Sequence, residues 1–470
     1  MSGSFVWTDA RVREALGLDP DPRTRELTFT GISTDTRTLD EGALFVALTG
    51  ERFDAHGFLD QAVAAGARGA VVSEAGTGVE GLPLYQVADT LVALGDLARY
   101  RRQGSSWQVV AITGSSGKTT VKNALAAALA PSFRVHATRG NLNNRVGVPL
   151  TVLEAPAEAR LLVLELATNE PGEIGVLTAV VEPDASLVVT VSETHLEGLG
   201  SLDGVLVEKL ALVEGTRDDG PVLVGDEPPV LAERARALRP DVRVAGFSAR
   251  ADEDLRGELL DCDDAGHWTF RFRDREVRGA LPGRHGATNL LLALSMAHLL
   301  GADLDDAVAA AASVQPGPMR GETLDLGDLR LILDCYNANP QSMEAALSFL
   351  AELPRPGEKV AFLGSMLELG ERAPEFHREV LDRARELPLC AVVGVGEFHE
   401  VAAGEAAPGE AQGPLVLLAP TADEGYDRLR PYLTGTETVL LKASRGVALE
   451  ALVDRFREDF GPTSSPDEEA

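Results

Sequence analysis

Cysteine is scarce in this chain, and positive charge is outweighed by negative charge. The three cysteines, Cys262, Cys335 and Cys390, are scattered and form no CxxC pair, which argues against a disulfide framework and predicts reduced thiols. Acidic residues outnumber basic ones by 73 to 43, and the formal net charge is −30. Nonspecific binding to nucleic acid or to an anionic membrane needs a basic face, so we expect neither partner.

The chain also lacks an apolar run long enough to span a bilayer, and its start, MSGSFVWTDARVREAL, lacks the basic and apolar segments of a secretory signal. We therefore expect a cytoplasmic protein. Lysine is rare, because only five of the 43 basic residues are Lys: Lys118, Lys122, Lys209, Lys359 and Lys442. Where Lys persists, a compact or titratable amine is expected, which Arg cannot supply.

A length of 470 residues, 44% of them hydrophobic and 5% aromatic, predicts an α/β protein of about three domains. The polar stretch 102–106 and the Pro-Gly-Pro at 316–318 mark the expected boundaries. We expect a small α/β domain over residues 1–103, a central P-loop ATPase-like parallel-sheet domain over 104–315, a Rossmann-like doubly wound domain over 316–462, and a disordered acidic tail over 463–470.

Short apolar runs predict the strands of these domains, since buried parallel strands read as continuous hydrophobic segments. In the first domain they are residues 42–48, 69–72 and 84–87, followed by a helix over 89–102. In the central domain they are residues 109–113, 161–166 and 187–191. In the third domain they are residues 329–333, 360–363, 391–393, 415–418 and 439–441.

A glycine-rich segment follows the first predicted strand of the central domain and precedes a helix expected from about Val121. It consists of Gly114, Ser115, Ser116, Gly117, Lys118, Thr119 and Thr120. Strand, glycine loop and helix form the setting that a phosphate cradle requires, with backbone N–H groups and Lys118 on the phosphates and Thr119 on magnesium. Ile112 stands where the full GxxxxGK[ST] pattern has its first Gly. An ordinary strand–helix turn is the less favoured interpretation.

Two polar residues lie at or just after the ends of the other predicted central strands. Glu165 closes the run 161–166, and His195 follows the run 187–191 by a short turn. Ligands of open α/β sheets bind beyond the carboxyl ends of strands, so these side chains and the glycine loop are expected to converge on a nucleotide–metal site. Each taken alone also fits a structural role, Glu165 as a helix cap and His195 as a structural histidine.

Lys209 has Val205, Leu206, Leu212 and Val213 at helical spacings of three and four, which places it on an apolar stripe. Burial lowers the pKa of a lysine and leaves a nucleophilic amine that can react with carbon dioxide to form an anionic carbamate, a possible metal ligand. A lysine that snorkels from the edge of a helix is the alternative.

Several strings of the chain resemble the Mur ligase family. They are STDTR at 33–37, GALFVAL at 42–48, GNLNN at 140–144, VGVPL at 146–150, YNANP at 336–340 with Ser342-Met343, GSMLELG at 364–370 and KASR at 442–445. The resemblance covers all three expected domains. It implies an ATP-dependent ligase that adds D-alanyl-D-alanine to a UDP-N-acetylmuramoyl-tripeptide through an acyl phosphate in peptidoglycan precursor synthesis.

The resemblance also implies residue roles around ATP. Thr119 and Glu165 would hold one Mg²⁺, and His195 with a carbamylated Lys209 would hold a second. Arg320 and Asp334 would reach the ATP phosphates and ribose from the third domain, so catalysis should require domain closure. Asn289 matches the second Asn of the family's adenine-contacting HNxxN pattern, whereas Gly286 replaces the first.

Substrate contacts are expected from three places. The resemblance implies that the first domain binds the UDP-sugar, for which we expect Ser33, Thr34, Asp35, Thr36 and Arg37. The second set is Asn141, Asn143 and Asn144 of the central domain, and the third is Asn337 and Asn339 of the third domain. A structural turn is the alternative for the Asn-Pro pair at 339–340. A monomer suffices for this chemistry.

Two other functions fit part of the pattern. One is a different ligase of the same fold, such as a folylpolyglutamate-type enzyme or another Mur ligase, and the first domain argues against the folate type, which lacks a UDP-sugar module. A nucleotide-dependent switch protein would bind ATP without needing a second metal site, and amine-dependent phosphate release separates it from a ligase.

Overall fold

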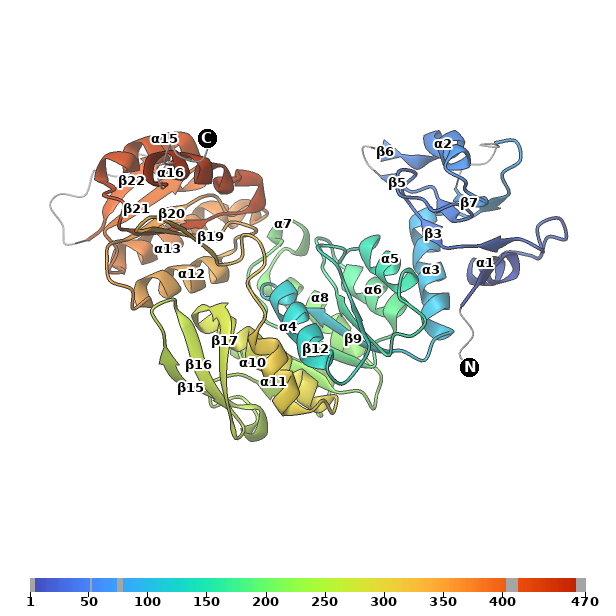
Figure 1. Cartoon of the computed structure of the whole chain (residues 1–470), viewed down its shortest axis with the longest axis horizontal. Coiled ribbons are helices and arrows are strands. Elements are labelled where there is room, and N and C mark those ends of the chain that lie inside the picture. Colours follow the sequence, from blue (N-terminus) through green and yellow to red (C-terminus); the bar gives the residue numbers. More distant parts are fainter. Residues whose placement is uncertain (1–4, 51–52, 74–78, 403–412, 462–470) are drawn as a thin grey trace, which may run out of the picture.

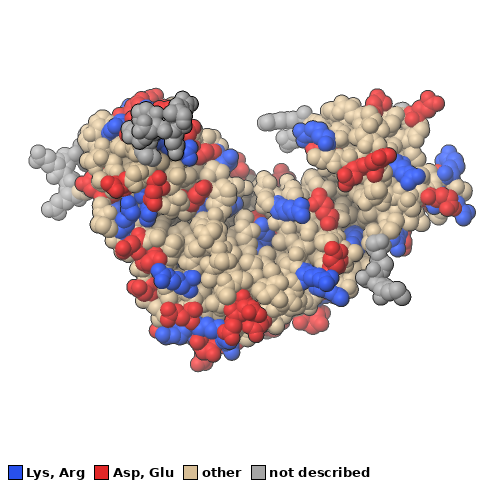
Figure 2. All heavy atoms as spheres, viewed as in Figure 1, with Lys and Arg blue, Asp and Glu red and all other residues tan. Residues whose placement is uncertain are grey.

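The computed structural model describes residues 5–50, 53–73, 79–402 and 413–461 of the 470; the expected tail at 463–470 lies outside them. Three α/β units follow one another along the chain (Figure 1). The first and third units both lie against the central one, and an open gap separates them at the upper edge of the molecule (Figure 2). Acidic and basic side chains are interspersed over the visible face. Within the described residues, no helix is both long and apolar enough to cross a membrane.

The first unit is a four-stranded parallel sheet of order β3-β4-β7-β8 with two small antiparallel ribbons. Its strands are β1 Trp7–Thr8, β2 Thr28–Phe29, β3 Ile32–Ser33, β4 Leu44–Val46, β5 Thr49–Gly50, β6 Phe53–Asp54, β7 Gly69–Val72 and β8 Leu84–Gln86. Its helices are α1 Asp9–Ala15, α2 Leu59–Ala64 and α3 Thr90–Gln103.

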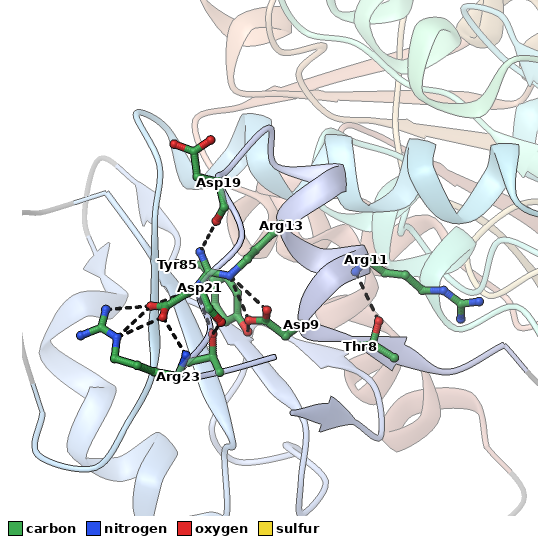
Figure 3. A network of polar contacts seen from close by, with 9 residues as sticks. Thr8, Asp9, Arg11, Arg13, Asp19, Asp21, Arg23 and Tyr85 are labelled. Carbon is green, nitrogen blue, oxygen red and sulfur yellow. Dashed lines mark hydrogen bonds and ion pairs between the residues drawn. The ribbon is translucent and has the colours of Figure 1, made fainter. Parts of the chain in front are cut away.

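A polar network ties helix α1 and the segment that follows it to the edge of this sheet (Figure 3). The hydroxyl of Tyr85 on β8 donates to Asp9 Oδ1 over 2.7 Å, and Arg13 Nε lies 3.0 Å from the same carboxylate. Asp9 and Tyr85 are both buried. Because each buried polar atom has a partner, the network holds α1 in place rather than destabilising the core.

The central unit is a six-stranded, fully parallel sheet of order β10-β11-β9-β12-β13-β14. Its strands are β9 Gln108–Thr113, β10 Val135–Ala137, β11 Leu161–Glu165, β12 Ala185–Val188, β13 Val222–Gly225 and β14 Arg243–Ala245. Its helices are α4 Lys118–Leu129, α5 Gly147–Leu153, α6 Glu173–Val181, α7 Leu196–Leu199, α8 Leu202–Glu214, α9 Pro229–Leu238, α10 Gly283–Leu299 and α11 Leu304–Ala312. A three-stranded antiparallel sheet, β15 Gly257–Cys262, β16 His267–Phe272 and β17 Arg275–Pro282, packs on α10.

Helix α3 includes Arg102 and Gln103, the first two residues of the expected polar linker at 102–106. Arg102 is the penultimate residue of α3 and is 3% exposed. Its guanidinium donates to the carbonyl of Val181 and pairs with Asp184 at 2.7 Å. Helix α3 is therefore fixed to the central sheet as well as to the first one, because a buried guanidinium requires such partners.

The third unit has a six-stranded sheet of order β18-β19-β23-β20-β21-β22, in which only β18 is antiparallel. Its strands are β18 Glu322–Leu326, β19 Leu329–Asp334, β20 Lys359–Leu363, β21 Ala391–Val395, β22 Leu415–Ala419 and β23 Thr438–Lys442. Its helices are α12 Pro340–Glu352, α13 Ala373–Glu386, α14 Glu397–Val401, α15 Ala422–Leu429 and α16 Leu452–Phe460. Helices α12, α13 and α14 cover one face and α15 and α16 the other, which confirms the doubly wound fold.

Candidate active site

The glycine loop after β9 has two positions whose backbone conformation favours glycine. Gly114 has φ +154° and Gly117 has φ +77°, a backbone region that L side chains rarely adopt. A Cβ at Gly117 would also lie 2.5 Å from Asn289 Oδ1. Because Gly117 turns the chain, helix α4 begins at Lys118, three residues before the predicted start near Val121.

Strand β12 begins and ends earlier than the predicted run 187–191, because the chain after it contacts the glycine loop. It ends at Val188, and the carbonyl of Thr190 accepts a hydrogen bond from Ser115 N over 2.8 Å. The chain beyond β12 thus braces the glycine loop instead of extending the sheet. Ser115 Oγ accepts a further bond from Ser192 N over 2.9 Å.

Lys118 lies at the first position of α4, and its amine donates to the carbonyl of Gly114 over 2.8 Å. Burial lowers the pKa of this amine. The lysine therefore folds back across the loop whose backbone N–H groups would face a phosphate.

Glu165, the last residue of β11, is 1% exposed. Its Oε1 accepts hydrogen bonds from Thr119 Oγ1 over 3.1 Å and from Asn143 Nδ2 over 2.9 Å. Its Oε2 is buried without a hydrogen-bond partner. A buried, unsatisfied carboxylate oxygen beside a threonine hydroxyl fits a hard cation such as Mg²⁺.

Across the described part of the chain, no group of three or more His, Cys, Asp and Glu side chains could hold a metal ion. The carboxylate and hydroxyl pair of Glu165 and Thr119 instead fits the way Mg²⁺ binds with nucleotides, through one or two protein oxygens and the phosphates.

His195 is the residue immediately before helix α7, has φ +53° and lines the same cavity as Glu165. Its Nδ1 lies 2.6 Å from Oε2 of Glu368, a residue of the third unit. This hydrogen bond lowers the pKa of Glu368. Sequence reasoning placed His195 at the sheet edge but did not single out its partner, although Glu368 lies within the string GSMLELG.

Lys209 is fully buried on α8, as its apolar stripe predicted, and does not snorkel to solvent. Its amine has no hydrogen-bond partner. Burial, and secondly the charge of Lys118, bring the pKa of Lys209 well below its usual value. The lowered pKa favours the neutral, nucleophilic form of the amine, although Lys209 is absent from the residues that line the cavity.

A cavity of about 650 Å³ lies between the central and third units. The glycine loop, Glu165 and His195 line it from the central side. From the third unit come Arg320, Asp334, Tyr336, Asn337, Asn339 and Lys442. The Arg320 guanidinium stacks 3.8 Å from the centre of the Tyr336 ring, which holds a cation at the wall of the cavity.

The HNxxN-like segment opens helix α10 at one side of this cavity. Asn289 lines the cavity, as do His285 and the apolar side chains of Phe247 and Leu259. A Cβ at Gly286 would lie 2.7 Å from the carbonyl oxygen of Leu281. Position 286 therefore has no room for a side chain.

Asn337 and Asn339, the two residues expected to contact the dipeptide, make different hydrogen bonds in the structure. Asn339 caps α12, because its Oδ1 accepts a hydrogen bond from Ser342 N over 2.8 Å. The side-chain oxygen of Asn339 therefore has a structural role. Asn337 Oδ1 accepts from Ala338 N, and its carbonyl accepts from Lys442 Nζ over 2.8 Å. Both residues line the cavity.

The remaining predicted substrate residues lie outside the cavity, except for Asn143. In the first unit, Asp35 and Arg37 pair at 2.6 Å after β3, and Ser33 Oγ donates to the carbonyl of Asp35. Thr34 and Thr36 flank Asp35 in the same loop. Asn144 Oδ1 accepts from Gly147 N at the start of α5, and Asn141 is exposed.

Glu208, beside Lys209 on α8, is a buried residue that sequence reasoning missed. Its two carboxylate oxygens accept from Gly172 N over 2.6 Å and from Ile174 N over 2.7 Å. These bonds fix the N-terminus of α6 and the segment before it, where Thr168 and Asn169 line the cavity. An acid within an apolar stripe was the available signal.

Three known domain families match successive parts of the chain. The Mur ligase family catalytic domain matches residues 28–102, the Mur ligase middle domain 112–297, and the Mur ligase glutamate ligase domain 319–445. The UDP-N-acetylmuramoyl-tripeptide–D-alanyl-D-alanine ligase of Escherichia coli is 36% identical, with 92% of this chain and 95% of the relative covered.

Solved structures of Mur ligases also resemble this chain. A crystal structure of MurF from Acinetobacter baumannii superposes with a TM-score of 0.86 at 30% identity, covering 97% of this chain and 99% of the other. MurF ligase from Thermotoga maritima in complex with ADP superposes with a TM-score of 0.79 at 27% identity, covering 92% and 97%.

Proposed function

Since the chain belongs to the Mur ligase family, we propose that it joins D-alanyl-D-alanine to a UDP-N-acetylmuramoyl-tripeptide at the cost of ATP, in peptidoglycan precursor synthesis. One observation carries the proposal. A phosphate loop with its lysine, a carboxylate with an unsatisfied oxygen, and a cation from the third unit line a single cavity. The coverage of relatives with this activity along nearly the whole chain supports the substrate assignment.

The first half-reaction transfers the γ-phosphoryl group of ATP to the tripeptide carboxylate. That carboxylate attacks phosphorus, ADP leaves, and an acyl phosphate forms. Backbone N–H groups of the loop and Lys118 would hold the phosphates, and Arg320 would reach them from the third unit. Thr119 and Glu165 would hold the magnesium, which offsets charge on the phosphate oxygens.

In the second half-reaction the amine of D-alanyl-D-alanine attacks the activated carbonyl. The tetrahedral adduct loses phosphate, and the amine loses a proton as the amide forms. We expect Asn337, whose carboxamide lines the cavity, to contact the dipeptide. The UDP-sugar would bind at residues 33–37 of the first unit, which stands apart from the third (Figure 1), so the units must close during turnover.

Lys209 is assigned a carbamate formed with carbon dioxide. The buried amine, which has no hydrogen-bond partner and a lowered pKa, supports this assignment, because a neutral amine is nucleophilic and its carbamate would be anionic. His195 and the carbamate would then hold a second magnesium ion. We place the reaction in the cytoplasm and assign a monomer.

The test is phosphate release from ATP with the UDP-N-acetylmuramoyl-tripeptide, with and without D-alanyl-D-alanine, in magnesium and bicarbonate. Release that requires both substrates, and that Lys209→Ala abolishes, is the expected result. Val207→Ala, an exposed position on the same helix, serves as the matched control and should retain activity. Release indifferent to D-alanyl-D-alanine would overturn the substrate assignment.

A further inference from the structure

A carboxylate of the third unit reaches a cavity-lining histidine of the central unit. Glu368 lies in the loop between β20 and α13, and its Oε2 is 2.6 Å from His195 Nδ1. A backbone hydrogen bond joins the same two segments, because Glu197 N donates to the carbonyl of Glu368 over 3.4 Å. The contact therefore joins two units that the chain connects only through long intervening segments.

The loop that carries Glu368 is anchored from both sides. Met366 N donates to Nε2 of the buried His377 over 2.8 Å, and Leu367 N donates to Ser444 Oγ over 3.0 Å. His377 is itself fixed, since its Nδ1 lies 2.6 Å from the carbonyl of Ala373. The direction of the Glu368 side chain is thus set by the third unit and not by the histidine alone.

Both partners have left-handed backbone conformations, with φ +53° at His195 and φ +64° at Glu368. Such conformations are strained for residues other than glycine and persist where the surroundings determine them. At neither position does glycine occur, although glycine would adopt this φ without strain. The side chains therefore account for the choice of residue.

The pairing determines which imidazole nitrogen carries the proton. A carboxylate accepts, so Nδ1–H donates to Glu368 and Nε2 keeps its lone pair. Histidines that bind metals commonly make this contact to a carboxylate through their other nitrogen, which fixes the tautomer and the ring orientation. Without Glu368 the ring would lose both constraints.

We propose that Glu368 is a positioning residue that holds His195 with Nε2 ready to bind magnesium, and that it does so only when the third unit is docked. The inference rests on the proposed function, because it assigns His195 to the metal site of the ligase. Docking of one unit and completion of the metal site in the other thereby become a single event.

The first test measures the tautomer in the protein without substrates. Histidine side chains are labelled with ¹⁵N, the His195 signal is assigned with His195→Gln, and spectra are recorded at pH 8. The wild type should show Nδ1 protonated and Nε2 bare. Glu368→Gly should lose this preference, and Glu368→Gln, whose amide oxygen still accepts, should keep most of it. An unchanged tautomer in Glu368→Gly would overturn the proposal.

The second test measures phosphate release against magnesium concentration. Loss of such an outer partner typically costs 10–100-fold in metal affinity or activity, so Glu368→Gly should raise half-saturation by magnesium at least 10-fold. Glu368→Gln should fall between this variant and the wild type. Glu371→Gln, an exposed acid three residues away, should behave like the wild type.

Stability separates positioning from a merely structural role. Glycine relieves the backbone strain at 368, so Glu368→Gly should unfold at the wild-type temperature or above it. A large loss of stability with unchanged magnesium dependence would contradict the proposal. If the wild type lacks ligase activity while the tautomer shifts as expected, the proposed function fails and the positioning role of Glu368 stands.

Discussion

Asp334 and Lys442 are neighbours across two parallel strands, and their side chains form an ion pair of 2.9 Å at the wall of the cavity. Lys442 is 2% exposed and also donates to the carbonyl of Asn337. One amine thus orients both a carboxylate expected to contact ribose and the loop expected to contact the dipeptide.

We expect Lys442→Met to destabilise the third unit by about 1–3 kcal/mol, because it leaves the partly buried carboxylate of Asp334 without its ion-pair partner. Nucleotide affinity should fall with it, since Asp334 and Asn337 lose their common anchor. Urea unfolding and ADP titration check the two effects. Stability equal to the wild type would show that Asp334 finds another partner.

Lys118→Met should reduce kcat for phosphate release by about 100–1,000-fold, the loss typical of removing one charge-stabilising donor from an active site. Folding should be retained, because this lysine donates only to a loop carbonyl. Lys359→Met is the matched control. That amine donates to the carbonyls of Ala351 and Leu353, so its loss should lower stability and leave kcat unchanged.

Lys209→Met should increase the free energy of unfolding at pH 7 in buffer free of bicarbonate. The folded-state pKa of Lys209 is well below its ordinary value of 10.5, so the unfolded chain binds the additional proton. Stability of the wild type therefore rises with pH between the folded and the unfolded pKa. The advantage of Lys209→Met should shrink as the pH approaches 10.5, and an advantage independent of pH would contradict the lowered pKa of Lys209.

Glu208→Gln should loosen the N-terminus of α6. Glutamine keeps one acceptor but turns an NH₂ group toward one of the two backbone N–H groups that Glu208 now binds. The expected cost is about 1–3 kcal/mol for the group left unsatisfied. Hydrogen exchange at Gly172 and Ile174 should accelerate, whereas Glu214→Gln, an exposed acid on the same helix, should leave it unchanged.

Tyr85→Phe should destabilise the first unit by about 1 kcal/mol, because it deletes the hydrogen bond to buried Asp9 (Figure 3). The ligase kcat under native conditions should not change, since Tyr85 does not line the cavity and belongs to the first unit. Tyr432→Phe, at a 55% exposed residue, is the control for removing a hydroxyl. Equal unfolding midpoints for the two variants would contradict the role of the network.

The parallel sheets were predictable because their strands are buried on both faces and read as continuous apolar runs. The run at residues 69–72 is β7 without change, and the run at 161–166 differs from β11 by one residue. Strands β15 to β17 were missed, because their residues alternate between buried and exposed positions and carry many charges. Such strands show no apolar run to a reader of the sequence.

The site was predictable where it depends on one sheet edge. The placement of Lys118 and Glu165 follows from strand ends and a glycine loop. The partners supplied by packing between units were not predictable in the same way. Glu368 meets His195 only because the third unit docks on the central one, and no local pattern specifies that contact. Glu208 required knowledge of the segment that its carboxylate caps.

All five lysine side chains are at least partly buried, and four of the five amines donate to main-chain carbonyls, with Lys209 as the exception. The folded surface described here therefore presents arginine but hardly any reactive side-chain amine. Reagents that acylate amines should label lysines slowly, and each labelled lysine should mark a site that has opened. The labelling rate of each lysine-containing peptide would then report how often the surrounding unit opens.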